Sequence, residues 1–302
     1  TNNGNCNAVT DVVQINFTAA PNANAGTDIS SCKNNPAVTL AGNVSGATTT
    51  GAWSGGTGTF NPNNSTLNTI YTPSAAELTA GSVTLTLAST GNGNCIASTD
   101  NVIINFTNPP VVNAGLDLSV CKNNLASILS GTVTGPSTTG IWSGGSGTFN
   151  PGSSVLNSTY TPSAAELTAG VVTLTLTSTA NGNCNAVTDV MQITLTNAPT
   201  VSAGSDVNSC KNNANTVLSG VISGPTTTGS WIGGTGSFNP GNSALTSTYT
   251  PSAAELTAGV VTLTLTSTNN GNCNAVTDVV QINFTAAPNA NAGIDISSCK
   301  NN

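Results

Sequence analysis

Hydrophobic and polar residues alternate along much of the chain. In Val83–Leu87, Val and Leu alternate with Thr, and in Val13–Phe17, Val, Ile and Phe alternate with Gln and Asn. A period of two residues predicts β-strands with one buried face and one solvated face. Leu40 and Val44, on either side of Gly42, predict a second strand.

Further strands and their turns follow from the same pattern. Trp53 is placed in a third strand, and Leu67, Thr69 and Tyr71 are placed on one face of another. Asn92-Gly93, between two alternating runs, predicts a hairpin connection. The sequence therefore predicts about seven short strands in each stretch of some ninety residues.

One short helix is predicted among these strands. Ser74 and Glu77 have the spacing of a capping box, Pro73 precedes them and Gly81 follows. A serine at the N-cap and a glutamate three residues later satisfy two free backbone N–H groups, and glycine closes a helix well. We therefore assign Glu77 a capping role.

The pattern recurs with a period of 89 residues. Trp53, Trp142 and Trp231 mark the period, and Pro-containing junctions lie near Pro21, Pro109-Pro110, Pro199 and Pro288. Such a period is typical of tandem domains. It predicts three complete repeats, at residues 20–108, 109–197 and 198–286.

The two ends of the chain carry nearly the same sequence. Residues 1–35 recur at residues 268–302 with one change, Thr27 to Ile294. This recurrence predicts that the chain is part of a longer array. Residues 1–19 would be the last strand of a preceding domain, and residues 287–302 the first strand of a following one.

The predicted fold class is all-β. About seven strands and one buried Trp in each repeat indicate an immunoglobulin-like sandwich. The whole chain is then predicted to be a tandem array of such sandwiches that forms an extended rod or filament.

Composition limits the possible functions. Of 302 residues, 5% are charged, the net charge is −7 and histidine is absent. No basic surface for nucleic acid is present, and no apolar run is long enough to enter a membrane in this segment. A histidine-based catalytic triad is impossible, and identical active sites in every repeat are implausible. We predict that the chain is not an enzyme and needs no cofactor.

Eight cysteines, with spacings that alternate between a shorter and a longer value, indicate disulfides and an extracellular compartment. The preferred pairing uses the longer spacing and joins two ends of one repeat. The competing pairing uses the shorter spacing, as in Cys95 with Cys121. Cys6 and Cys299 would pair outside the chain. The preferred pairs are Cys32–Cys95, Cys121–Cys184 and Cys210–Cys273.

Calcium is the one metal ion that the sequence makes worth considering. Asp28 and Asp100 recur in every repeat beside asparagines, and Ca²⁺ takes six to eight oxygen ligands. The alternative is that these carboxylates accept hydrogen bonds at turns and strand ends. The second interpretation is preferred, because no dense cluster of acidic residues exists.

Several motifs carry a resemblance to a known class of repeats. Asn24–Asp28 with Cys32, Gly93–Cys95 and Thr99-Asp100 resemble the PKD-like and Ig-like repeats of giant Bacteroidetes surface proteins. Trp53–Gly58 and Tyr71–Glu77 are similar to repeats in the large SprB-like adhesins of gliding flavobacteria, although Trp-Ser-Gly-Gly replaces the usual PKD signature. The resemblance implies export by the type IX secretion system and display in long filaments on the cell surface.

Two classes of function remain open at this point. The first is a structural stalk or filament segment of a bacterial cell-surface adhesin, serving adhesion or gliding motility. The second is a set of glycan- or partner-binding modules that act together by avidity. Few aromatic residues are present and most are placed in the core, which favours the stalk. The partners are then neighbouring repeats of the same chain, with lateral or end-to-end self-association as a further expectation.

Overall fold

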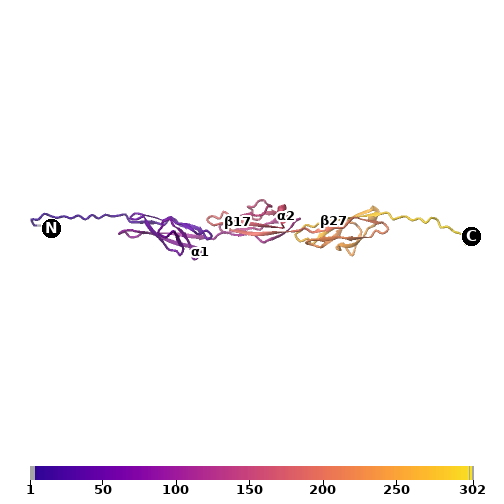
Figure 1. Ribbon diagram of the computed structural model, residues 1–302, viewed down its shortest axis with the longest axis horizontal. Helices are drawn as coiled ribbons and strands as arrows, with labels where there is room; N and C mark the ends of the chain where they lie inside the picture. Colours follow the sequence, from indigo (N-terminus) through magenta and orange to yellow (C-terminus); the bar gives the residue numbers. More distant parts are fainter. Residues whose placement is uncertain (1–3, 299, 301–302) are drawn as a thin grey trace. The chain divides into compact units, whose positions relative to one another are not determined.

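The computed structural model describes residues 4–298 and Lys300. Its elements repeat in the same order three times, with nine strands and one six-residue helix in each repeat of the described chain (Figure 1). The first repeat contains β1 (Asn22–Asn24), β2 (Ile29–Cys32), β3 (Val38–Thr39), β4 (Asn43–Ser45), β5 (Thr50–Ser54), β6 (Thr59–Asn61), β7 (Ile70–Thr72), α1 (Ala75–Ala80), β8 (Ser82–Thr90) and β9 (Thr99–Thr107).

The other two repeats have equivalent elements. The second contains β10 (Val111–Asn113), β11 (Leu118–Cys121), β12 (Ser127–Ile128), β13 (Thr132–Thr134), β14 (Thr139–Ser143), β15 (Thr148–Asn150), β16 (Thr159–Thr161), α2 (Ala164–Ala169), β17 (Val171–Thr179) and β18 (Thr188–Thr196). The third contains β19 (Thr200–Ser202), β20 (Val207–Cys210), β21 (Thr216–Ser219), β22 (Val221–Ser223), β23 (Thr228–Ile232), β24 (Ser237–Asn239), β25 (Thr246–Thr250), α3 (Ala253–Ala258), β26 (Val260–Thr268) and β27 (Thr277–Thr285).

The first and third repeats each form a two-layered sandwich. In the first, a four-stranded sheet in the order β2-β9-β8-β5 faces a three-stranded sheet in the order β3-β7-β6, and β1 pairs with β4. The third repeat has the equivalent sheets β20-β27-β26-β23 and β21-β25-β24. Most pairs are antiparallel, but β2 runs parallel to β9 and places Cys32 opposite Thr107.

The core lies between the sheets and follows the predicted alternation. Along β8, Val83, Leu85 and Leu87 are buried while the threonines between them are exposed or half-buried. Trp53 and Tyr71 are fully buried against them. Full burial of a large apolar side chain is worth about 1.5–3 kcal/mol, so these side chains supply much of the stability of a small repeat.

The predicted strand around Gly42 is two strands in the structure. β3 ends at Thr39 and pairs with β7, whereas β4 begins at Asn43 and pairs with β1. The chain changes partner at Gly42, where a Cβ atom would lie 2.8 Å from the ring of Trp53. Only glycine fits this close approach, so the residue that interrupts the alternation also separates the two strands.

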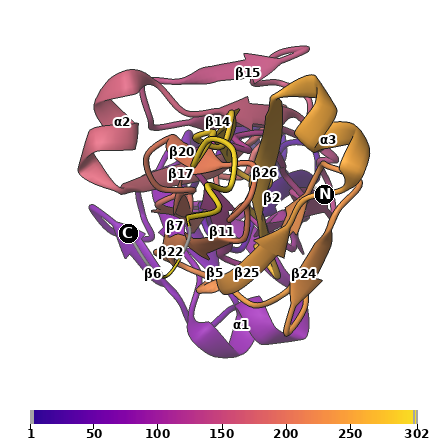
Figure 2. The same ribbon diagram turned by 90° about the vertical axis from the view of Figure 1, so that its right-hand side faces the viewer.

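The predicted helix is confirmed. α1 begins after the N-cap Ser74, has the reciprocal hydrogen bonds of a capping box with Glu77, and ends at Gly81, whose φ of 87° is left-handed. The three helices are short coils outside the sheets of their own repeats (Figure 2).

The chain divides into two compact units that cut through the middle repeat. The first comprises the residues up to Asn113 together with Gly131–Ile141 and Leu176–Asp189, and the remaining residues form the second. The described residues 4–20 and 286–298 form no strand or helix (Figure 1). The strands predicted for residues 1–19 and 287–302 are therefore not formed in the parts of these segments that the structure describes.

Candidate functional site

Cys32 and Cys95 lie near opposite ends of β9. Cys32 ends β2, and the parallel register places it beside Thr107, the last residue of β9. Cys95 lies four residues before β9 begins at Thr99. A nine-residue strand is about 26 Å long, whereas the Cα atoms of a disulfide lie about 4.4–6.8 Å apart. The two cysteines of one repeat therefore cannot be joined.

The disulfides join successive repeats instead. Cys32 of the first repeat is bonded to Cys184 of the second, and Cys121 of the second is bonded to Cys273 of the third. Each bond spans 152 residues and lies within one compact unit. The predicted pairs Cys32–Cys95, Cys121–Cys184 and Cys210–Cys273 are wrong, and so is the alternative that uses the shorter spacing.

The error has a physical cause. In a perfect tandem repeat, a bond from Cys32 to Cys95 and a bond from Cys32 to Cys184 join the same two kinds of cysteine. The periodic sequence does not distinguish them. The parallel pairing of β2 with β9 determines which cysteine Cys32 can reach. It places Cys32 beside the last residue of β9, at the end of the repeat that leads into the next repeat.

The remaining cysteines of the described chain have no disulfide partner in it. Cys95 and Cys210 are half-buried and unbonded, and Cys6 is exposed and unbonded. Cys32 and Cys121, the bonded equivalents of Cys210, are fully buried, whereas Cys184 and Cys273, the bonded equivalents of Cys95, are half-buried. The predicted partner of Cys299 cannot be compared, because Cys299 lies outside the described residues.

Asparagines surround each disulfide and form a second set of contacts, which we call the asparagine clamp. In the first clamp, the side chain of Asn34 donates to the carbonyl of Asn185 at 3.0 Å and accepts from its backbone N–H at 3.0 Å. The amide of Asn185 in turn donates to the carbonyl of Asn34 at 2.8 Å. Asn35 donates to the carbonyl of Asn183, and Asn183 donates to that of Ser30.

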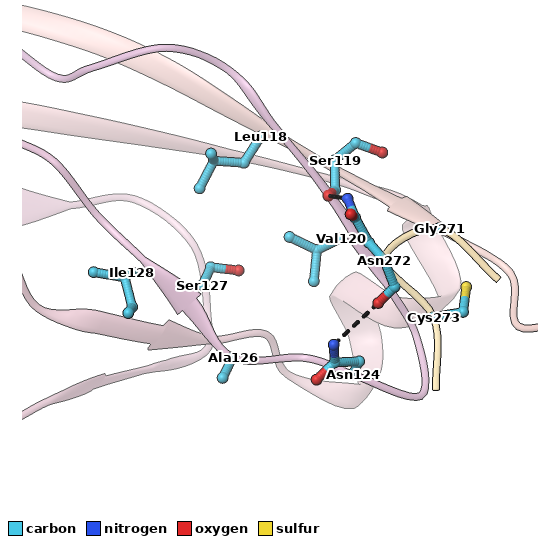
Figure 3. Close-up of a pocket in the computed structure, with 10 residues that line it drawn as sticks. All are labelled: Leu118, Ser119, Val120, Asn124, Ala126, Ser127, Ile128, Gly271, Asn272 and Cys273. Atoms are coloured by element: carbon cyan, nitrogen blue, oxygen red, sulfur yellow. Dashed lines mark hydrogen bonds between the residues drawn. The ribbon is translucent and has the colours of Figure 1, made fainter. Parts of the chain in front are cut away.

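The second clamp repeats these contacts. Asn123 and Asn274 exchange the same three hydrogen bonds, at 2.7–3.0 Å. Figure 3 shows the other two: Asn124 donates to the carbonyl of Asn272, and Asn272 donates to that of Ser119. The same five hydrogen bonds and a disulfide occur at both sites, which indicates that this junction between successive repeats is a regular feature of the fold.

A shallow groove accompanies each clamp. The groove in Figure 3, about 450 Å³ in volume, is bordered by Val120, Ser127 and Ile128 on one side and Asn272 on the other. The equivalent groove at the first clamp is about 490 Å³ in volume. Neither is lined by an acidic or basic side chain, so neither carries groups for acid–base catalysis.

The sequence carried a signal for the clamp. Lys-Asn-Asn follows Cys32, Cys121 and Cys210, and Asn-Gly-Asn precedes Cys95, Cys184 and Cys273. The chain is rich in Asn throughout, but next to the first and the second cysteine of each repeat Asn occurs at fixed positions. This regularity is the signal. One position departs from the pattern: Ile96 stands where Asn185 and Asn274 form clamps, and its side chain is 91% exposed.

The two candidate calcium ligands are held by backbone groups. The Asp28 carboxylate accepts from the N–H of Ile103 at 2.9 Å, and the Asp100 carboxylate accepts from the N–H of Ala25 at 2.8 Å. Both bonds tie the beginning of the repeat to β9. The described residues contain no group of three or more His, Cys, Asp or Glu that could hold a metal ion.

A buried tyrosine and glutamate form a second constellation that the sequence did not predict. The Tyr71 hydroxyl donates to the Glu77 carboxylate at 2.8 Å and accepts from the N–H of Gly58 at 2.9 Å. The same carboxylate accepts from the backbone N–H of Thr57 and of Ser74. Glu77 therefore caps α1 and also holds the turn before β6.

Both ionisable groups have shifted pKa values. Burial raises the pKa of Tyr71 to about 12, and its hydrogen bond to Glu77 adds to this effect. Burial alone would raise the pKa of Glu77, but the N–H groups of Ser74 and Thr57 and the Tyr71 hydroxyl lower it below its ordinary value. The pattern is the same for Tyr160 with Glu166 and for Tyr249 with Glu255.

This constellation is structural. Tyr71 is fully buried and Glu77 is almost fully buried, and the groups around them are those of their own repeat.

In the described chain, no helix is long and apolar enough to cross a membrane.

Comparison with known proteins identifies no family for this chain. No protein-family model matches the chain, and no curated protein matches it. The sheets of the repeats decide the class. The repeats are immunoglobulin-like β-sandwiches.

Solved structures with similar arrangements are themselves tandem domains. Titin domains I67–I69, in an E-to-A mutated variant, are 14% identical, with a TM-score of 0.45, over 89% of this chain and 99% of that one. Sidekick-1 immunoglobulin domains 1–5 are 13% identical, with a TM-score of 0.36, over 90% and 60%. Drosophila OTK extracellular domains 3–5 are 10% identical, with a TM-score of 0.35, over 89% and 97%.

Proposed function

We propose that this chain is a structural segment of an extracellular stalk or filament. The observation that carries the proposal is the covalent junction: each disulfide and its asparagine clamp join one repeat to the next. The cysteines and asparagines at these junctions connect repeats and do not line a binding cleft within one repeat. Such connections support a mechanical role. Disulfides also fit an oxidising, extracellular compartment.

The aromatic residues support this role over recognition of glycans. The three Trp and three Tyr of the chain are buried in the cores. The rings of Phe60 and Tyr71 pack on one another, with centroids 4.9 Å apart. None of these Trp and Tyr side chains offers an exposed aromatic platform to a sugar ring.

The finer proposal is a cell-surface adhesin of bacteria, of the kind used in adhesion or gliding motility and exported by the type IX system. Its support is the resemblance of the Trp53–Gly58 and Tyr71–Glu77 motifs to repeats of such adhesins. In this role the repeats hold an adhesive region away from the cell and do not bind a target themselves.

Replacement of the repeats tests the proposal. In the cell that makes the protein, the three repeats are exchanged for an unrelated disulfide-free array of immunoglobulin-like domains of equal length. A stalk predicts that surface adhesion is retained, while shortening by one or two repeats lowers it. The matched control removes the distal region and keeps the repeats, which should abolish adhesion.

The opposite result would identify binding modules. If adhesion is lost on exchange, and the isolated three-repeat chain binds a glycan array or cell surface, the repeats act by multivalent recognition.

A further inference from the structure

The two disulfides close loops that overlap. Cys121 lies inside the loop closed by Cys32–Cys184, and Cys184 lies inside the loop closed by Cys121–Cys273. Separate loops, as expected from bonds within repeats, would divide the chain into independent rings. Overlapping loops instead create two interleaved covalent paths along the array.

The first path uses only short pieces of chain. It runs from Cys6 to Cys32, crosses the disulfide to Cys184, and continues to Cys210. The second path runs from Cys95 to Cys121 and crosses the disulfide to Cys273. Each complete piece of backbone between two cysteines is about 26 residues long, which corresponds to a last strand, a linker and the first strands of the next repeat.

Most of each repeat lies outside both paths. Residues 33–94, 122–183 and 211–272 hold the buried Trp, the helix and all strands from β3 to β8 or their equivalents. The two paths meet inside every repeat as a parallel pair of strands. These pairs are β2 with β9, β11 with β18, and β20 with β27.

Much of a complete piece on the paths is already in extended strands. Between Cys184 and Cys210, the nine residues of β18, three of β19 and four of β20 are in strands. A strand rises about 3.3 Å per residue, and a fully extended chain reaches at most about 3.6 Å. Unfolding therefore adds little length to either path.

We propose that the interleaved disulfides limit the extension of the array, so that repeats unfold under tension without lengthening the tether. From Cys32 to Cys210, two repeats onward, the oxidised path is one disulfide and about 90 Å of backbone, whereas the reduced chain reaches about 620 Å. This inference rests on the proposed structural role, but the measurement below tests the covalent topology by itself.

Single-molecule pulling from the two ends of the chain tests the proposal. Cys6, Cys95, Cys210 and Cys299 are first replaced by serine to prevent exchange. In this chain the shortest covalent route with both disulfides runs from the first residue to Cys32, from Cys184 back to Cys121, and from Cys273 to the last residue. At about 3.5 Å per residue, its final contour length should be about 430 Å, against about 1,050 Å in the chain without disulfides. The full chain in reducing buffer serves as the control for the second value.

The decisive result is a lack of additivity. Removal of one bond, by Cys32→Ser with Cys184→Ser, should add only about 90 Å, because the other bond alone still bypasses 152 residues, most of the length that the two bonds bypass together. The pair Cys121→Ser and Cys273→Ser should add the same length. Removal of both bonds should add about 620 Å, roughly sevenfold more than removal of either alone.

Two outcomes would overturn the proposal. If an oxidised chain that keeps all eight cysteines loses about 220 Å for each of three bonds, independently, the bonds close separate loops within repeats. If reduction does not change the contour length, the junction bonds do not form. Loss of adhesion in the exchange experiment, with the non-additive lengths intact, would instead remove only the proposed stalk function.

Discussion

The same nine residues have two conformations in this molecule. Thr277–Thr285, with the sequence TDVVQINFT, is the strand β27, in which Ile282 is 0% exposed and Phe284 is 6% exposed. Thr10–Thr18 has the identical sequence and forms no strand; there, Ile15 is 69% exposed and Phe17 is 91% exposed. Local sequence is the same, so propensity is the same, and the difference lies entirely in the neighbours.

β27 has a strand on each side. It runs antiparallel to β26 and parallel to β20, and its inward side chains join the core of Trp231 and Tyr249. No described strand pairs with residues 10–18. A single strand leaves its backbone N–H and C=O groups without partners and its apolar face in water, so alternation alone does not form one.

A core substitution should produce the largest contrast between the two copies. Ile282→Ala should lower the free energy of unfolding of the third repeat by about 3–4 kcal/mol, because a fully buried side chain leaves a cavity. Ile15→Ala, the matched control, should change it by less than about 0.5 kcal/mol. Denaturant titration measures both. Equal effects would show that residues 10–18 are packed in solution.

Tyrosine ionisation should report on the complete repeats alone, because the three tyrosines lie at positions 71, 160 and 249 and none lies in the terminal copies. Each has a pKa raised to about 12. A raised pKa gives stability that is present below the unfolded value of about 10 and is lost as the pH rises through about 12, on the order of 2–3 kcal/mol per tyrosine.

Absorbance at alkaline pH checks this expectation. In the folded chain all three phenols should ionise near pH 12, and in denaturant near pH 10. Tyr249→Phe should remove one third of the signal. At the acid end, the lowered pKa of Glu255 gives stability that is lost as the pH falls below its ordinary value towards the folded one. Ionisation of the folded chain near pH 10 would contradict the buried tyrosine–glutamate pair.

A smaller contrast is expected at the aspartates of the two copies. The Asp278 carboxylate accepts from the N–H of Ala203 at 2.8 Å and ties β27 to the beginning of its repeat. Asp11, its equivalent, accepts from the neighbouring N–H of Val12 and from no other group among the described residues. Asp278→Ala should cost about 1–2 kcal/mol, and Asp11→Ala close to none. Thermal unfolding of both variants, measured in EDTA and in calcium, also distinguishes this hydrogen-bonding role from metal binding. Calcium should not shift the unfolding midpoint of either variant.

The smallest effect is expected at the one position where the two copies differ. Thr27 is exposed in the first copy, and Ile294 stands at this position in the second. Thr27→Ile should change the free energy of unfolding by less than about 0.5 kcal/mol and leave β1 and β2 in place. Loss of β1 and β2 from the circular dichroism or NMR spectrum would make this residue, and not the missing neighbours, the cause of the difference.

Much of the fold was predictable because its signals are local. Alternation located β8 and β9, and the capping box located α1. The burial of Trp53 and Tyr71 also followed from their positions in strands. Gly42 was misjudged, because its role depends on the ring of Trp53, which approaches it from another strand.

The candidate site was less predictable than the fold. The cysteines were located, but their pairing was wrong, and the contacts of Asn34 with Asn185 were missed. The asparagines beside the cysteines marked the positions, but no local pattern shows which distant position is the partner. In a repeating chain, every long-range choice has a periodic alternative with the same residues.

The sequence by itself determined which residues face inward, where the helix begins and ends, and how often the domain recurs. These properties depend on neighbours within a few residues along the chain. The tertiary structure alone decided whether TDVVQINFT is a strand and which cysteines bond. Both depend on the partners of the last strand: antiparallel β8 or β26 covers one edge, and parallel β2 or β20 covers the other and places the first cysteine at the end that leads to the next repeat.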